Sequence, residues 1–144
     1  MRLTQFTDYA LRLLMLLAAE PDRRLTIQQV SEFHGISRNH LMKVANRLAR
    51  AGILSPSRGR NGGLRLARPP EDVGVGDIIK ASEPDFALVG CMAGENCAIA
   101  PVCRLTGVLD GALADFLASA NRYSLADIVP DASAFRVPAA TGPL

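Results

Sequence analysis

The 144-residue sequence predicts a mainly α-helical fold with one small β-hairpin. Three observations carry this prediction. Apolar residues recur at helical spacing in the first third of the chain, the stretch "RGRNGG" separates two short runs that can pair as strands, and a second helical stripe occupies the last third. We expect three regions: residues 1–70, residues 71–129 and a loose tail at 130–144.

The first expected helix extends from about Thr4 to Ala19. Its apolar residues follow the i, i+3, i+4 spacing of a helix face, and Pro21 ends it. This face consists of Phe6, Tyr9, Leu13, Leu16 and Leu17. The stripe predicts that one side of the helix packs on the core.

A second, short helix is expected over "IQQVSEF". It begins where Thr26 and Gln29 match a capping box, in which each side chain satisfies a free backbone N–H group. Gly35 can take the positive φ angle of a tight turn between helices. Ser37 can cap the next helix, "RNHLMKVANRLARAG", which ends at Gly52. Two short helices around a glycine turn make a helix-turn-helix.

A β-hairpin is expected next, with "ILSPS" and "LRLA" as its strands. Leu64 and Leu66 alternate with Arg65, as in a strand with one buried face. The glycine-rich tip between the strands carries Arg58, Arg60 and Asn61. A helix-turn-helix followed at once by a basic hairpin is a winged helix-turn-helix, which is the architecture that the sequence predicts for residues 1–70.

The last third predicts a short helix over "VGDIIKASE", a long helix from about Arg104 to Asn121 and a final apolar anchor, "LADIV". The long helix carries an apolar stripe far from the N-terminal core. The stripe consists of Leu105, Leu109, Ala112, Leu113, Phe116, Leu117 and Ala120. In a chain of this size we expect the copy of this helix in a second subunit to cover the stripe, so the sequence predicts a homodimer held by a long dimerisation helix.

The net charge of +2 conceals an uneven distribution. Residues 23–68 hold ten basic side chains and one acidic one, whereas the segments on either side are both net acidic. A block of this kind is typical of a protein that binds a polyanion. A helical hairpin used for protein contacts is the alternative, and the basic wing favours double-stranded DNA.

The winged helix predicts which side chains would touch DNA. A third helix that enters a major groove brings its N-terminal residues to the base edges, and the wing follows phosphates or the adjacent minor groove. The predicted DNA-binding residues are Ser37, Arg38, Asn39, His40, Lys43, Arg58, Arg60, Asn61 and Arg65. Two subunits imply a palindromic operator.

Cys91, Cys97 and Cys103 stand at equal six-residue steps and are all the cysteines of the chain. Thiolates select zinc, copper(I) or iron–sulfur clusters, and two five-residue gaps lack the C-x₂-C spacing usual for zinc. The open loop therefore predicts an iron–sulfur cluster completed by a ligand other than cysteine. A redox switch made of thiols alone and three inert thiols are the alternatives.

Other classes of protein find little support in the sequence. No signal peptide is recognisable, and the apolar run "LRLLMLLAA" contains Arg12 and is too short to span a membrane. We therefore expect a cytoplasmic protein without membrane contact, where an odd number of reduced thiols argues against a disulfide scaffold. No nucleophile, base and orienting group form a catalytic motif, so an enzyme is not expected.

Several stretches carry a family resemblance. "MRLTQFTDYALRLL", "RGRNGGLRLARPPEDVGVGDIIKASEP", the C-x₅-C-x₅-C triplet and "RYSLADIV" together resemble the NsrR family of bacterial nitric-oxide-sensing repressors. These are dimeric winged-helix regulators related to the cluster-biogenesis regulator IscR. The resemblance covers residues 1–129 and implies a transcriptional repressor whose iron–sulfur cluster, 4Fe–4S or alternatively 2Fe–2S, senses nitric oxide. Nitrosylation of the cluster would release operator DNA.

The resemblance also bears on the ligand that completes the cluster. IscR-like proteins carry a histidine three residues after the last cysteine, and this position is Thr106 here. NsrR-like proteins have an acidic residue in the first helix, which matches Asp8 in "FTDY". The resemblance implies that Asp8 ligates the cluster of the partner subunit. From the residues alone, Asp8 can equally stabilise the N-terminus of its helix, and a regulator that senses iron or cluster supply is the alternative function.

Overall fold

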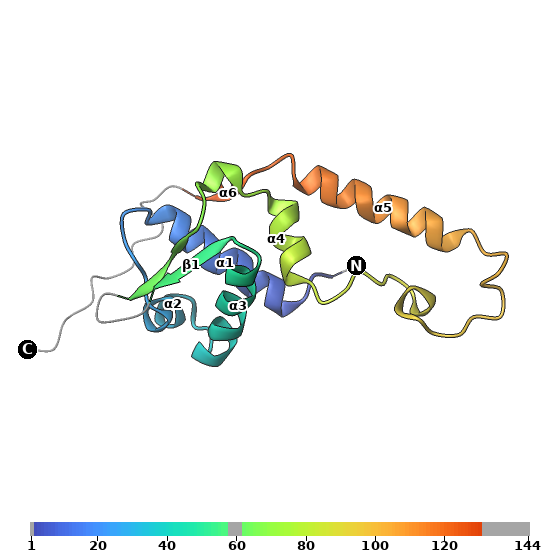
Figure 1. The fold of residues 1–144 in the computed structure, drawn as a ribbon, viewed down its shortest axis with the longest axis horizontal. Helices are drawn as coiled ribbons and strands as arrows, with labels where there is room; N and C mark the ends of the chain where they lie inside the picture. The colour runs from blue at the N-terminus through green and yellow to red at the C-terminus, as the bar shows by residue number, and fades with distance from the viewer. Residues whose placement is uncertain (1, 58–61, 131–144) are drawn as a thin grey trace, which may run out of the picture.

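The computed structural model describes residues 2–57 and 62–130 (Figure 1). The described elements follow in the order α1 (Gln5–Ala19), α2 (Ile27–His34), α3 (Arg38–Arg50), β1 (Leu54–Ser57), β2 (Gly63–Leu66), the 3-10 turn η1 (Pro70–Asp72), α4 (Val75–Ser82), the 3-10 turn η2 (Gly90–Ala93), α5 (Leu105–Ala120) and α6 (Leu125–Ile128). The mainly helical fold with one antiparallel hairpin confirms the predicted fold class.

Local sequence signals begin and end the helices of the helix-turn-helix. The side chain of Thr26 accepts from the backbone of Gln29, and the Gln29 side chain accepts from the Thr26 backbone, which completes the expected capping box. Gly35 lies in the left-handed region at φ +65° between α2 and α3. The Ser37 hydroxyl accepts from the backbone N–H of His40 and caps α3. The expected helix-turn-helix is therefore confirmed, although α3 ends at Arg50 with Ala51 as its C-cap, and the expected cap Gly52 follows at φ +70°.

The hairpin packs on the helices through one face. Its register runs from Leu54 opposite Leu66 to Ser57 opposite Gly63, and Leu25 pairs with Leu64 beside it. Leu64 is buried, whereas the intervening Arg65 is exposed, as the alternation predicts. The tip lies outside the described residues, and with it the predicted DNA contacts Arg58, Arg60 and Asn61.

One apolar core joins the N-terminal helices, the hairpin and two later segments. Leu13, Leu48 and Val30 of the first three helices are fully buried, and so are Ile78 of α4 and Leu125 of α6. Because α6 returns to the core, the chain leaves this unit after α4 and comes back at its end. We call residues 2–84 and 124–130, without the tip, the body, and residues 85–123 the arm.

The arm projects from the body, with α5 running alongside the cysteine segment (Figure 1). No residue of α5 is fully buried. Part of the stripe assigned to a second subunit is instead half-covered by α4 and by the segment that precedes α5, namely at Leu109, Leu113, Phe116, Leu117 and Ala120. The face of α5 that stays open carries Leu105 and Val108, which are 50% and 66% exposed. Sequence periodicity could not separate these two faces because both are apolar.

Helix α4 connects the body and the arm, and each of its ends is held by side chains from a distant part of the chain. At its start, Asn121 accepts from the backbone N–H of Asp77 at 2.9 Å and donates to the Asp77 carboxylate at 3.1 Å. Gly74 and Gly76 leave the space that the Asn121 side chain fills.

Within the described residues, none of the helices is both long and apolar enough to span a membrane.

Candidate DNA-binding face and cysteine segment

Helix α3 has a buried side and a polar solvent side. Leu41, Val44, Ala45 and Leu48 face the core. The exposed side carries Arg38, Asn39, Met42, Lys43, Asn46 and Arg50 along the whole length of the helix. Three predicted contacts, at positions 38, 39 and 43, therefore lie on this side, which also exposes residues 42, 46 and 50, positions that the sequence analysis did not single out. Met42 and Asn46 lie three or four residues from these positions, and Arg50 lies seven residues, or two helical turns, after Lys43, so helical spacing was the signal that could have found them.

Two predicted residues of this region have additional contacts within the chain. Ser37 uses its hydroxyl as the cap of α3. The exposed ring of His40 lies 5.9 Å from the ring of Tyr9, measured between centroids, so His40 is on the flank of α3 that faces α1. His34, in contrast, lies at the end of α2, with its Nε2 atom 3.1 Å from the backbone oxygen of Arg12. Burial lowers the pKa of His34 below its ordinary value.

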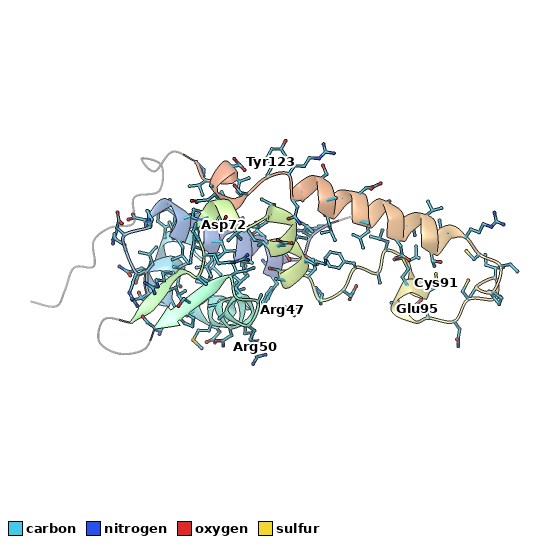
Figure 2. All side chains as sticks on the ribbon, turned by 45° about the horizontal axis from the view of Figure 1, so that its top comes forward. Arg47, Arg50, Asp72, Cys91, Glu95 and Tyr123 are labelled. Atoms are coloured by element: carbon cyan, nitrogen blue, oxygen red, sulfur yellow. The ribbon has the colours of Figure 1, made fainter. Side chains whose placement is uncertain are left out.

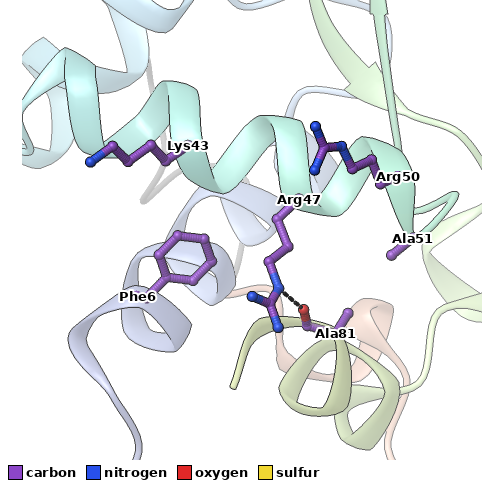
Figure 3. Close-up of a pocket in the computed structure, with 6 residues that line it drawn as sticks. All are labelled: Phe6, Lys43, Arg47, Arg50, Ala51 and Ala81. Atoms are coloured by element: carbon purple, nitrogen blue, oxygen red, sulfur yellow. Dashed lines mark hydrogen bonds between the residues drawn. The ribbon is translucent and has the colours of Figure 1, made fainter. Parts of the chain in front are cut away.

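Arg47 joins helix α3 to the end of α4 (Figure 3). Its Nε donates to the backbone oxygen of Ala81 at 2.7 Å, and one terminal nitrogen donates to the Glu83 backbone oxygen at 2.9 Å. The last carbonyls of a helix lack partners within it, and a guanidinium satisfies them well. The guanidinium also lies 6.0 Å from the centre of the Phe6 ring. Sequence reasoning missed Arg47, because its acceptors lie more than thirty residues away.

A cationic hollow opens beside this contact. It has a volume of about 540 Å³ and is lined by Phe6, Lys43, Arg47, Arg50, Ala51 and Ala81. Arg47 reaches down from α3 toward α4, whereas Lys43 and Arg50 extend along and away from the helix (Figure 3). The hollow extends the positive potential of the α3 face toward α4.

Glu83 links the end of α4 to the start of α1. The residue is only 8% exposed, and its Oε1 accepts from the backbone N–H of Thr4 at 2.8 Å and from the Thr4 hydroxyl at 3.0 Å. The carboxylate is thus satisfied by two donors, as a buried charge requires. The start of α1, the end of α4 and, through Arg47, helix α3 meet at this point, immediately before the arm begins.

Asp8 lies on the surface of α1 and is paired within its own helix. Its carboxylate accepts from the Arg12 guanidinium at 3.1 Å and 3.0 Å, and both side chains are about half exposed. A shallow hollow of about 870 Å³ lies beside them, lined by residues from Arg2 to Arg12. Asp8 is therefore accessible, and a new partner for its carboxylate has to compete with Arg12.

The three cysteines lie in the arm with free thiols. Cys91 and Cys103 are half-buried, and Cys97 is exposed. Cys91 lies in η2, at the end of the arm that is remote from Arg47 and Arg50 (Figure 2). The thiol of Cys103 accepts from the backbone N–H of Leu105 at 3.4 Å, at the start of α5.

The described chain by itself holds no assembled metal site. Over residues 2–57 and 62–130, no three His, Cys, Asp or Glu side chains converge as ligands. The donor set nevertheless fits an iron–sulfur cluster in its chemistry, because it consists of three thiols outside any disulfide, which are of the type that ligate iron and sulfide. A cluster would have to draw the three thiols together, and a ligand other than the cysteines of this chain would have to complete it.

A comparison with known protein families identifies the family of this chain. The family model described as Rrf2, iron-dependent transcriptional regulator, matches residues 3–131. The chain belongs to the Rrf2 family. Rrf2 proteins are transcription regulators, so the chain is a DNA-binding regulator and not an enzyme, as the sequence predicts.

Solved structures share this Rrf2 fold. CymR, the global cysteine regulator of B. subtilis, is 22% identical with a TM-score of 0.66, and the match covers 90% of this chain and 96% of that one. The IscR of T. potens is 23% identical with a TM-score of 0.69, covering 96% and 94%. The oxidized form of Staphylococcus aureus CymR is 22% identical with a TM-score of 0.68, covering 90% and 96%. At this identity the likeness establishes the winged-helix fold alone.

Proposed function

We propose that this Rrf2 regulator is a dimeric repressor whose arm holds an iron–sulfur cluster that senses nitric oxide. One observation carries the proposal: three free thiols at equal steps lie on an arm with no core of its own, separate from a body that presents a cationic helix. A sensor needs a part that responds and a part that binds DNA, and the two parts are distinct here.

The DNA-binding part of the proposal rests on α3. Arg38, Asn39 and Lys43 are exposed at its first turns and are suited to base edges and phosphates. Arg65 is exposed on β2, on the approach to the wing tip. The proposal also keeps Ser37 and His40 as contacts, with the cap and the Tyr9 contact as additional roles, and keeps the tip residues Arg58, Arg60 and Asn61.

The dimer is supported by the open face of α5. Leu105 and Val108 expose apolar surface, and side chains added at Gly107 and Gly111 would meet nothing within 4 Å in the single chain. Glycine inside a helix costs about 1 kcal/mol relative to alanine, so glycines without an intrachain reason are consistent with close approach of a second helix. Two copies of the body would then be held at a fixed spacing on a palindromic operator.

The proposed ligands are Cys91, Cys97 and Cys103 of one chain and Asp8 of the partner subunit. When bound, a cluster supplies iron that reacts with nitric oxide; the proposed cluster is 4Fe–4S, with 2Fe–2S as the alternative. The residues of the chain would hold the cluster and connect it to the two bodies. The thiols hold the arm loop closed, and Asp8 leaves its ion pair with Arg12 to join this loop to the helix α1 of the other body.

Helix α4 offers the route from the arm to α3. Asn121 ties the end of α5 to the first turn of α4, and Arg47 ties the last turn of α4 to α3. A change in the position of the arm therefore reaches α3 through direct contacts. Shifting the DNA-binding state from 99:1 to 1:99 requires a difference of about 5.5 kcal/mol between the two states, which loss of several ligand bonds can supply.

The deciding experiment is anaerobic purification, with iron and sulfide analysis and a visible spectrum, followed by DNA titrations before and after addition of nitric oxide. We expect a coloured protein with bound iron and a DNA affinity at least tenfold lower after nitric oxide. Cys97→Ser and Asp8→Ala should weaken cluster retention, whereas Asp22→Ala, an exposed carboxylate in a loop, should not. A colourless, iron-free protein that binds DNA equally well with and without nitric oxide would refute the proposal.

A thiol redox switch is the second candidate, favoured by the exposure of the free thiol of Cys97. It predicts a protein without iron whose DNA affinity changes with thiol oxidants. A regulator of iron or cluster supply is the third and predicts that Asp8→Ala changes neither cluster stability nor DNA affinity. The same titrations separate all three.

A further inference from the structure

Met42 is an apolar side chain on the polar face of the recognition helix. It is 48% exposed, and the residues one turn away on either side, Arg38 and Asn46, are exposed and polar. The other strongly exposed large apolar side chains of the described residues are all in the arm: Leu88, Ile99, Val102, Leu105, Val108 and Tyr123. Within the described body, Met42 is therefore alone, and it lies on the face that the proposed function assigns to DNA.

The position of Met42 around α3 points it away from α1 and α4. His40 and Arg47 occupy the flank of α3 that contacts α1 and α4. With about 100° of rotation per residue, Met42 lies on the opposite flank, about 60° from Asn39 and about 40° from Asn46. The thioether therefore shares one exposed patch with two amides, and none of the contacts of α1 or α4 covers it.

The chemistry of this patch matches A·T base pairs in a major groove. Asparagine amides suit the N6 and N7 edge of adenine. The single apolar group in the major groove is the C5-methyl of thymine, and methionine adapts its flexible, polarizable side chain to such a group. No acidic side chain lies on the exposed face of α3 to accept from cytosine.

We infer that Met42 packs against a thymine methyl group in each operator half-site and is a specificity-determining residue. The inference rests on the proposed DNA-binding role of α3. Asn39 and Asn46 are separated by about 10.5 Å along the helix axis, so an α3 bound in the groove spreads the two amides over at most about three base-pair steps. The thymine read by Met42 therefore lies within this window, between the base pairs that face the two amides.

The test begins with the full-length protein and a random double-stranded DNA library, from which bound sequences are enriched. Each thymine of the enriched site is then replaced singly by uracil, which removes the methyl group and keeps the O4 acceptor and base pairing. At one position in each half-site we expect the affinity of the wild type to fall about fourfold, as for the loss of one buried methyl-sized group. Met42→Ala should bind the thymine site more weakly and show no uracil effect there.

Two further variants define the outcome. Met42→Leu should retain the uracil effect because it keeps an apolar contact, and Lys43→Ala should lower affinity for both DNAs equally. Circular dichroism verifies that each variant is folded, which the exposure of Met42 favours. Two outcomes with salt-dependent binding overturn the Met42 contact alone. In the first, uracil lowers the affinity of wild type and of Met42→Ala equally. In the second, uracil has no effect at any position, which would point to a protein partner for the methionine. Absence of any salt-dependent binding or enrichment overturns the DNA-binding role and the contact together.

Discussion

The body and the arm differ in how far a single chain completes them. The body encloses leucines with no exposed surface, such as Leu13 and Leu48, and its buried Glu83 carboxylate has two donors. The arm has no fully buried residue in α5 and leaves Val108 mostly exposed. Burial of apolar surface is the main favourable term in folding. One chain therefore encloses the core of the DNA-binding unit, whereas it leaves an apolar face of the arm uncovered.

The largest expected effect separates the two regions by leucine truncation. Leu48→Ala empties a fully buried site in the body and should reduce the free energy of unfolding by about 3 kcal/mol. Leu109→Ala in the half-covered face of α5 should cost about 1 kcal/mol or less. Urea denaturation followed by circular dichroism measures both, and equal losses would remove the distinction between body and arm.

A charge on the open face of α5 tests what the arm depends on. Val108→Glu would bury a carboxylate without a partner in the proposed interface and should weaken dimerisation by at least about 2 kcal/mol. The body should stay folded, because Val108 is 66% exposed in the single chain. Sedimentation velocity measures the association, with Lys80→Glu on the exposed side of α4 as control. A dimer of unchanged affinity would mean that another surface joins the subunits.

Arg47 and Arg50 of α3 differ in whether they contact the rest of the body, so their alanine variants should differ in stability. Arg47→Ala removes two hydrogen bonds to the end of α4 and should lower the free energy of unfolding by about 1–2 kcal/mol. The same variant should also bind DNA more weakly. Arg50 is exposed on the same helix, and Arg50→Ala should leave stability within about 0.5 kcal/mol while lowering the log–log salt slope of DNA binding by about 1. Identical stabilities of the two variants would contradict a coupling role for Arg47.

The smallest expected effect is the pH dependence that His34 contributes. Burial lowers its pKa in the folded body, so the unfolded chain takes up a proton at a higher pH than the folded one. Stability contributed by the neutral ring is therefore present above the ordinary value of 6.5 and is lost as pH falls through the lowered folded pKa. The melting temperature of His34→Gln should fall less than that of the wild type between pH of about 7.5 and about 5.5. A steeper fall in the variant would reverse this assignment.

The elements that the sequence predicted well are those encoded by neighbouring residues. The capping box of Thr26 and Gln29, the positive φ of Gly35 and the cap of Ser37 all act within a few residues, so their signals are local. They determine where α2 and α3 begin and how the turn between them bends. The winged-helix fold class follows from these signals and the hairpin.

Contacts between residues far apart in the chain were not predicted from the sequence. Arg47 looks like any other cation of the basic block until its acceptors on α4 are known, and Asn121 looks like the end of a helix until Asp77 is found beside it. The two apolar faces of α5 have the same period, so only packing shows which face the chain itself covers. The roles of the cysteines and of Asp8 stay predictions, because no three potential metal ligands converge within residues 2–57 and 62–130.

The hydrogen bonds between Asn121 and the first turn of α4 connect the end of α5 to α4, so a rotation of α5 about this point would also move α4. The sixteen residues of α5 span about 24 Å and the eight of α4 about 12 Å, with the pivot where the two helices meet. If both turned together about that pivot, a displacement of 1 Å at the cysteine end would be a rotation of about 2.4° and would appear as about 0.5 Å at the end of α4 that Arg47 holds. In such a rotation the end of α4 moves half as far as the cysteine end of α5 and receives twice the force, so a small shift of the packed helix α4 would accompany a larger shift at the proposed cluster site.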